Sequence, residues 1–160
     1  MKKPLLYQFD LHQQLYNNVL DGFTDVESNR RLHKNMNHVK YLAGHILNSQ
    51  YGLGILAGAD LDIKWHDMFA VMGQSKAKDD FPYPTIEEIR AEWNTIYPPL
   101  RKQLDDLSPK NLNSKPPEPF DQIGDSVAEV WTFINHHTAY HLGQIGILRR
   151  GFDKEPMKYS

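Results

Sequence analysis

The apolar residues of this chain recur every three or four positions in four long segments, and this spacing limits the fold more than any other feature of the sequence. The segments span about residues 5–23, 34–56, 85–107 and 124–150. No stretch alternates apolar and polar residues over a useful strand length, and no internal repeat is present. With 160 residues, the chain is long enough to bury a core in one compact domain. The sequence therefore predicts an all-α fold, a four-helix bundle forming a single domain over residues 1–160.

Local signals mark where these helices begin, weaken or bend. Thr85 and Glu88 have the spacing of a capping box, so the third helix is expected to begin there. Gly52 and Gly54 weaken the last turns of the second segment, because each glycine costs a helix roughly 1 kcal/mol relative to alanine. Two consecutive prolines at 98 and 99 interrupt the third segment and predict a kink or a restart.

Two long connections separate the predicted helices. Residues 108–120 contain four prolines and are expected to form an extended, irregular crossover. With connections of this length, helices that follow one another in the chain need not pack as simple antiparallel hairpins. Residues 58–84 are apolar enough for a short packed helix that includes Trp65, Met68, Phe69, Val71 and Met72.

The charge balance and the absence of cysteine exclude several classes of protein. The 18 Lys and Arg residues face 20 Asp and Glu residues, whereas nucleic-acid-binding domains usually carry a basic excess. Without cysteine there is no disulfide, thiolate nucleophile or Cys-ligated metal. The first residues lack the apolar run of a secretory signal, and the longest apolar stretch, residues 41–59, is too polar for a membrane span. The sequence therefore predicts a cytoplasmic protein that binds neither nucleic acid nor membrane.

The position of each histidine on its helix decides which of them could share a ligand. At about 100° per residue, His137 and His141 fall on the apolar face of the fourth helix, whereas His136 points away. Two imidazoles four residues apart can bind one metal ion, although two packed core histidines have the same spacing. A third ligand is expected from the second segment, where His45 and His38 lie on nearly the same line. The mid-helix position favours His45. The eight histidines are His12, His33, His38, His45, His66, His136, His137 and His141.

Two further inward side chains are accessory candidates beside such a site. His12 lies at the centre of the apolar stripe of the first helix, either as a hydrogen-bonded core histidine or as a fourth ligand or acid–base group over the metal. Gln144 lies on the side of the fourth helix that carries His137 and His141. It serves either in an ordinary helix–helix hydrogen bond or near the metal. The pattern assigns no catalytic residue.

Two sequence motifs resemble a known family. The sequence HTAYHLGQI at residues 137–145, followed by LRR, resembles the last-helix signature of the DinB/YfiT-like family of metal-dependent enzymes. The Gly-His pair at 44–45 resembles the histidine of that family's second helix, and the resemblance covers roughly residues 5–151. It implies a four-helix bundle with long crossover connections, in which His45, His137 and His141 hold a divalent metal ion. It also implies a small-molecule substrate, a frequent homodimer and the damage-inducible, stress-related expression for which the family is named. The family includes thiol S-transferases that use low-molecular-weight thiols.

Three histidine ligands imply a catalytic rather than a structural metal site. Neutral nitrogen ligands leave a divalent ion with its full charge and an open coordination position. Imidazole ligands suit Zn²⁺, Ni²⁺, Fe or Cu, and the sequence does not choose among them. The expected ion is Zn²⁺ or Ni²⁺, with Fe or Mn as alternatives. Such an ion lowers the pKa of bound water, holds a thiolate or polarises a carbonyl. The sequence therefore predicts a metal-dependent hydrolase or thiol transferase. Two alternatives stay open: a non-catalytic protein that binds a metal or small ligand, and a bundle in which the histidines only pack.

Overall fold

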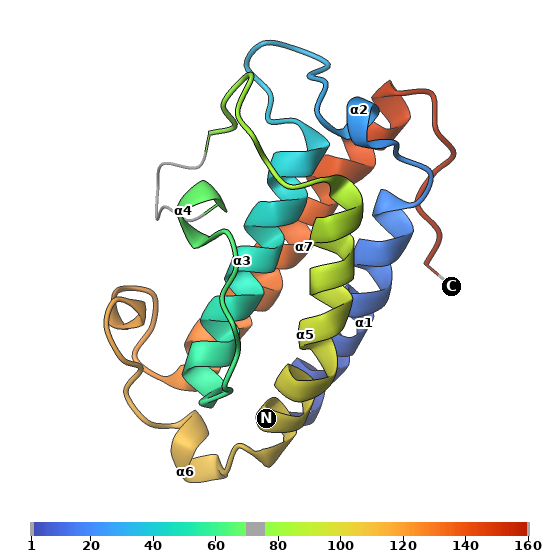
Figure 1. The fold of residues 1–160 in the computed structure, drawn as a ribbon. Helices are drawn as coiled ribbons and strands as arrows, with labels where there is room; N and C mark the ends of the chain where they lie inside the picture. The colour runs from blue at the N-terminus through green and yellow to red at the C-terminus, as the bar shows by residue number, and fades with distance from the viewer. Residues whose placement is uncertain (1, 70–75, 160) are drawn as a thin grey trace.

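The computed structural model describes residues 2–69 and 76–159, in which four long helices lie side by side (Figure 1). α1 and α3 each pack against both α5 and α7, so the four helices form a ring around a shared core. The described residues contain no strand, which confirms the predicted all-α fold class. Among the same residues, no helix is long and apolar enough to cross a bilayer. The long helices are α1 (Lys2–Leu20), α3 (Val39–Ala57), α5 (Ile86–Asp106) and α7 (Val127–Gly151).

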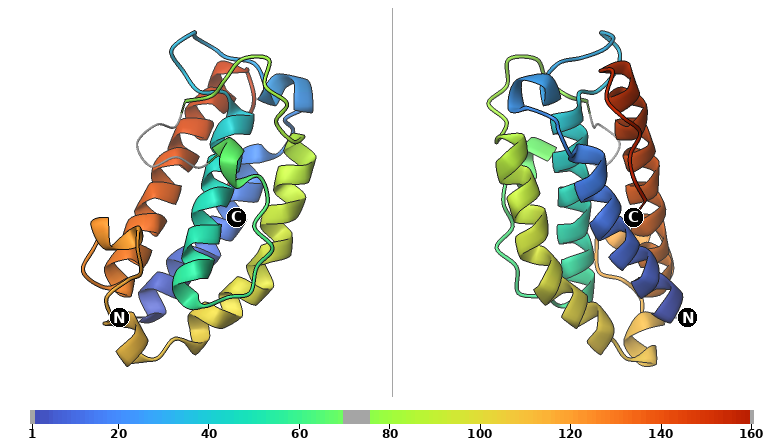
Figure 2. Two further views of the ribbon diagram at one scale, coloured as in Figure 1. Left: turned by 60° about the vertical axis from the view of Figure 1, so that its left-hand side comes forward. Right: turned by 90° about the vertical axis from the view of Figure 1, so that its right-hand side faces the viewer.

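The helix directions explain why the connections are long. α1 and α7 run in one direction, and α3 and α5 run in the other (Figure 1 and Figure 2). Because α3 and α5 are parallel neighbours, the chain returns along the bundle between the end of α3 and the start of α5. The closest packing partners of α1 are α5 and α7 rather than α3, so the connection from α1 to α3 crosses one end of the bundle.

Short helical turns interrupt the connections. α2 (Asp25–Ser28) follows α1, and α4 (His66–Phe69) lies where the sequence predicts a short packed helix. The expected contribution of Val71 and Met72 to that helix lies outside the described residues. The prediction that residues 108–120 are extended is wrong in part, because α6 (Pro109–Leu112) and the 3₁₀ helix η1 (Phe120–Gln122) form there. Pro109 takes the first turn of α6, where its missing N–H costs no hydrogen bond.

The start of α3 differs from the sequence prediction because a histidine caps it. α3 begins at Val39 rather than near residue 34. His38 has an extended backbone, and its Nδ1 accepts the N–H of Tyr41 at 3.0 Å. Ser, Thr, Asp and Asn usually fill this role, so a residue pattern does not reveal the cap. His38 is thereby held at the end of α3, buried and committed to the backbone.

α5 begins as the sequence predicts but continues through its prolines. The Thr85 hydroxyl accepts the N–H of Glu88, whose carboxylate accepts the N–H of Thr85, which confirms the capping box. The predicted restart at Pro98 is wrong, since α5 is one continuous helix. Both prolines lie on the exposed side, so the carbonyls of Asn94 and Thr95 that lose their N–H partners face solvent.

The glycines near the end of α3 make room for side chains from the connections. A Cβ atom on Gly54 would lie 2.5 Å from Leu61, and one on Gly52 would lie 3.2 Å from Phe120. Each of these side chains therefore packs directly on the helix backbone. The predicted weakness of the last turns is not observed, because α3 continues to Ala57 and ends at Gly58 with a φ of +72°.

The core consists of two clusters of buried apolar residues along the bundle. On α7, one cluster ends at Ile134 and the other begins at Leu142. On α3, one cluster includes Ile46 and the other includes Leu53. These contacts hold α3 and α7 together on both sides of the turns that carry the predicted histidine ligands.

Candidate metal centre

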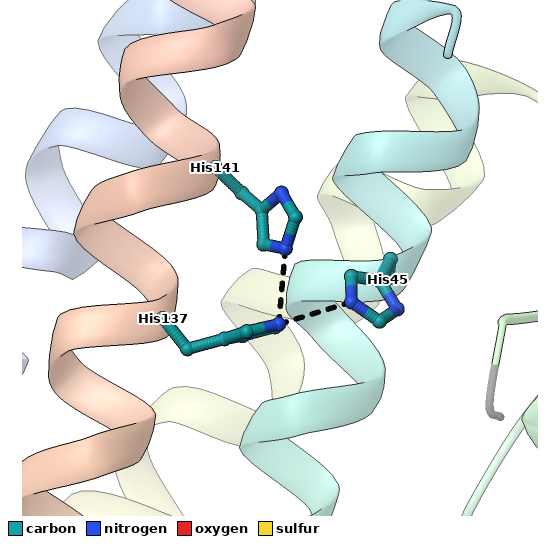
Figure 3. Close-up of side chains that lie close together, drawn as sticks. All are labelled: His45, His137 and His141. Carbon is teal, nitrogen blue, oxygen red and sulfur yellow. Dashed lines mark hydrogen bonds between the residues drawn. The ribbon is translucent and has the colours of Figure 1, made fainter. Parts of the chain in front are cut away.

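Three histidine side chains converge between α3 and α7. His45 comes from the middle of α3, and His137 and His141 come from successive turns of α7 (Figure 3). Nε2 of His137 lies 3.0 Å from Nε2 of His45 and 3.0 Å from Nε2 of His141. One ligand nitrogen of each ring lies within 4.8 Å of those of the other two. The structure thus brings together the three residues that the sequence predicts as metal ligands.

In two of these rings, Nδ1 donates a hydrogen bond to a defined acceptor. Nδ1 of His45 lies 2.9 Å from the backbone carbonyl oxygen of Phe69. A carbonyl can only accept, so this nitrogen carries the proton and Nε2 of the neutral ring keeps a lone pair. Nδ1 of His141 lies 2.7 Å from Oε1 of Gln144, which selects the same tautomer.

Ser49 selects the tautomer of the third ring from the neighbouring helix. Its hydroxyl donates to the carbonyl oxygen of His45 at 3.1 Å, and its oxygen lies 3.2 Å from Nδ1 of His137. Because the hydroxyl hydrogen is already used, the Ser49 oxygen accepts and Nδ1 of His137 carries the proton. All three rings therefore turn an unprotonated Nε2 toward one point.

The lone pairs of the three Nε2 atoms repel one another at this spacing, and a bound cation would remove that repulsion. In neutral rings with protonated Nδ1 atoms, no proton remains for the 3.0 Å contacts between Nε2 atoms, so these contacts are repulsive without a cation. Nitrogens at about 2.0–2.1 Å from Zn²⁺, with angles between about 90° and 109°, lie about 2.9–3.4 Å apart. The two distances from Nε2 of His137, 3.0 Å each, fall in this range. The cluster is therefore compatible with a divalent metal site.

Burial keeps the three rings neutral near pH 7. It lowers the pKa of His137 to about 3, and the neighbouring histidines add to the effect. Burial also lowers the pKa of His45 and of His141, although the hydrogen bonds of their Nδ1 atoms oppose it. Neutral imidazole is the form that binds metals, so these three rings would need to lose no proton to bind an ion at that pH.

A family comparison covers most of the chain. A profile described as DinB superfamily matches residues 8–145. The chain belongs to the DinB superfamily. The matched residues include His45, His137 and His141, and the match confirms the resemblance that the sequence motifs indicate. A search of curated proteins found no match to the chain.

In this DinB-superfamily protein, a glycine positions the acceptor of His45. A Cβ atom on Gly44 would overlap the ring of Phe69, so the glycine lets Phe69 lie against α3. Phe69 is 1% exposed, and Tyr41 stacks on His45 with ring centroids 5.9 Å apart. The sequence reveals the Gly44-His45 pair but not Phe69 as an acceptor, because every residue type offers the same backbone carbonyl. The spacing of Ser49, one helical turn after His45, is a signal from which its place beside the cluster could be predicted.

The accessory candidates lie in different places. Gln144 lies beside the cluster, and its Oε1 contacts Nδ1 of His141 within α7. This oxygen therefore does not form the helix–helix hydrogen bond that was one of its two predicted roles. His12 is buried on α1 and is not a member of the three-histidine cluster. Its proposed action as a fourth ligand or acid–base group stays a prediction. His136 is exposed, as its position on the helix predicts.

Acid is expected to destabilise the protein through His12. Burial lowers its pKa from 6.5 to about 4, so the unfolded state takes up a proton first as the pH falls. Above pH 6.5 His12 is neutral in both states and takes nothing from the free energy of unfolding. That free energy decreases as the pH falls from 6.5 toward 4. At pH 5.5 the loss is about 1.4 kcal/mol. Between pH 7.5 and 5.5, His12→Leu is expected to lose about that much less stability than the natural chain in urea denaturation with a chelator present. An equal loss of unfolding free energy in His12→Leu and in the natural chain contradicts this role of His12.

Proposed function

We propose that His45, His137 and His141 bind one divalent metal ion, and that the protein is a metal-dependent enzyme acting on a small molecule as a hydrolase or thiol transferase. One observation carries the proposal: three unprotonated Nε2 atoms from two helices converge, with His137 3.0 Å from each of the others. Membership of the DinB superfamily supports the same function, because the resemblance of the histidine motifs to that family implies a metal-dependent enzyme.

The residues around the cluster hold the rings and leave the centre accessible. The acceptors on Phe69, Ser49 and Gln144 fix the ring orientations and raise the basicity of the ligating nitrogens. A bound ion supplies Lewis-acid activation of water, a thiol or a carbonyl. His45 and His137 are only half-buried, so the cluster reaches the surface, as a small-molecule substrate requires.

A non-catalytic metal-binding protein is the alternative function. It requires a closed site, for which the sequence offers His12 as a fourth ligand. The cluster of described residues does not include His12, which favours an open centre and hence the enzyme. The low-molecular-weight thiol as substrate and the homodimer stay predictions from the family resemblance, and a thiol-transfer assay decides the first of them.

Metal analysis tests the proposed function. The purified protein is expected to hold about one equivalent of Zn²⁺, Ni²⁺ or a related ion by mass spectrometry, and a variant with alanine at 45, 137 and 141 less than about a tenth of that. A chelator is expected to lower the Tm of the natural chain but not that of the variant. An ion bound only to the native state adds about 2.7 kcal/mol at a hundredfold excess over its Kd. Equal metal content in both proteins refutes the proposal.

A further inference from the structure

Residues 61–69, here called the strap, run along α3 in the direction opposite to that helix (Figure 1). The strap contacts α3 or its neighbour α5 at four levels, and each step forward along the strap reaches a point further back along α3. Its last residue, Phe69, supplies the carbonyl that fixes His45. The strap is therefore a continuous element between the far end of α3 and the histidine cluster.

The far end of the strap is attached by packing and by an ion pair. Leu61 fills the space beside Gly54, where a Cβ atom would lie 2.5 Å away. Nζ of Lys64 lies 2.5 Å from Oε2 of Glu92 on α5, and the other carboxylate oxygen of Glu92 accepts the hydroxyl of Tyr51 at 2.7 Å. Glu92 is only 6% exposed, and these two partners occupy both of its carboxylate oxygens.

The near end of the strap lies against the cluster. Nδ1 of His66 lies 3.0 Å from Oδ1 of Asn48, one turn of α3 beyond His45. The Phe69 ring then fills the space at Gly44, while its carbonyl oxygen accepts from His45. This acceptor is a backbone atom, so only the docking of the strap determines where it lies.

We propose that the strap is a positioning element: its attachment at Leu61 and Lys64 sets the orientation of the His45 ring and thereby the metal affinity of the cluster. The proposal rests on the proposed metal-binding function. Gly54 and Gly44 lie ten residues apart in α3, about 15 Å along the helix axis. The attachments at Leu61 and Lys64 therefore act on the metal through the strap rather than by contact. Coupling is reciprocal, so metal binding protects the strap amides from hydrogen exchange by the factor that strap docking adds to the affinity.

Zn²⁺ titration in competition with a chromophoric chelator tests the proposal. Leu61→Ala is expected to bind Zn²⁺ about 5- to 10-fold more weakly than the natural chain, because complete loss of an acceptor of this kind costs about 10- to 100-fold. Leu112→Ala is the matched control, since it truncates the same side chain in α6, on the other connection. Lys64→Ala and Lys102→Ala form a second pair. Both lysines make 2.5 Å ion pairs, but Lys102 pairs with Asp106 on the surface of α5.

A second measurement needs no metal. In the metal-free natural chain, the Nδ1 proton of His45 is expected to exchange slowly with solvent in NMR spectra, and in Leu61→Ala at least about fivefold faster. Unchanged Zn²⁺ affinity and unchanged proton exchange in both strap variants overturn the proposal. So does an equal loss of affinity in Leu61→Ala and Leu112→Ala. If the natural chain binds no Zn²⁺ or related ion, the proposed function fails, and the His45 proton still tests the strap.

Discussion

Replacing His137 with alanine is expected to weaken metal binding more than about 100-fold, because loss of an outer hydrogen-bond partner alone costs 10- to 100-fold. Nε2 of His137 is the atom that lies 3.0 Å from the Nε2 atoms of both other histidines in the cluster. Without it, His45 and His141 are left as two ligands on different helices. Competition with a chelator of known affinity measures the change.

Two variants on the same helix make this result specific. His136→Ala removes the exposed neighbouring histidine and is expected to change the affinity less than about twofold, because that ring lies outside the cluster. Gln144→Ala removes the acceptor of the His141 proton. Its loss of metal affinity is expected to lie between those of the other two variants, at about 10- to 100-fold. A His137→Ala protein that binds the ion as tightly as His136→Ala contradicts the assignment of His137 as a ligand.

The pairing of His137 with His141 could be predicted from sequence because both lie on one helix. A fixed rotation per residue places them on one face without knowledge of any neighbour. His45 was harder, since periodicity alone also allows His38. The mid-helix position favours His45, and the structure brings His45, not His38, into the three-histidine cluster. His38 is instead the N-cap of α3, where its Nδ1 accepts the backbone N–H of Tyr41.

What the sequence could not show are contacts between segments far apart in the chain. The carbonyl of Phe69 has no residue signature, and its position depends on a crossover whose path follows from the parallel packing of α3 and α5. Gly52 and Gly54 were interpreted as helix weakeners because intrinsic propensity counts only local terms. In the structure they are the places where Phe120 and Leu61 pack on the helix backbone. Tertiary packing outweighs propensity at both positions.

Replacing Gly44 with alanine is expected to destabilise the protein by about 1–3 kcal/mol and to weaken metal binding about 10-fold or more. The added methyl group would overlap the buried Phe69 ring, which must then move away from α3. Alanine favours a helix over glycine by about 1 kcal/mol, which offsets only part of this cost. As the ring moves, the carbonyl that holds His45 moves with it. Urea denaturation and chelator competition measure the two effects.

The control for this variant lies on α7. A Cβ atom on Gly143 would meet nothing within 4 Å, so Gly143→Ala is expected to stabilise the protein by about 0.5–1 kcal/mol and to leave metal affinity unchanged. The two substitutions make the same chemical change in two helices of the same site, and they differ in what occupies the space beside the backbone. A Gly44→Ala protein that matches Gly143→Ala in stability and affinity shows that the Phe69 ring yields without disturbing His45. In that case the contact between Phe69 and α3 does not determine the orientation of the His45 ring.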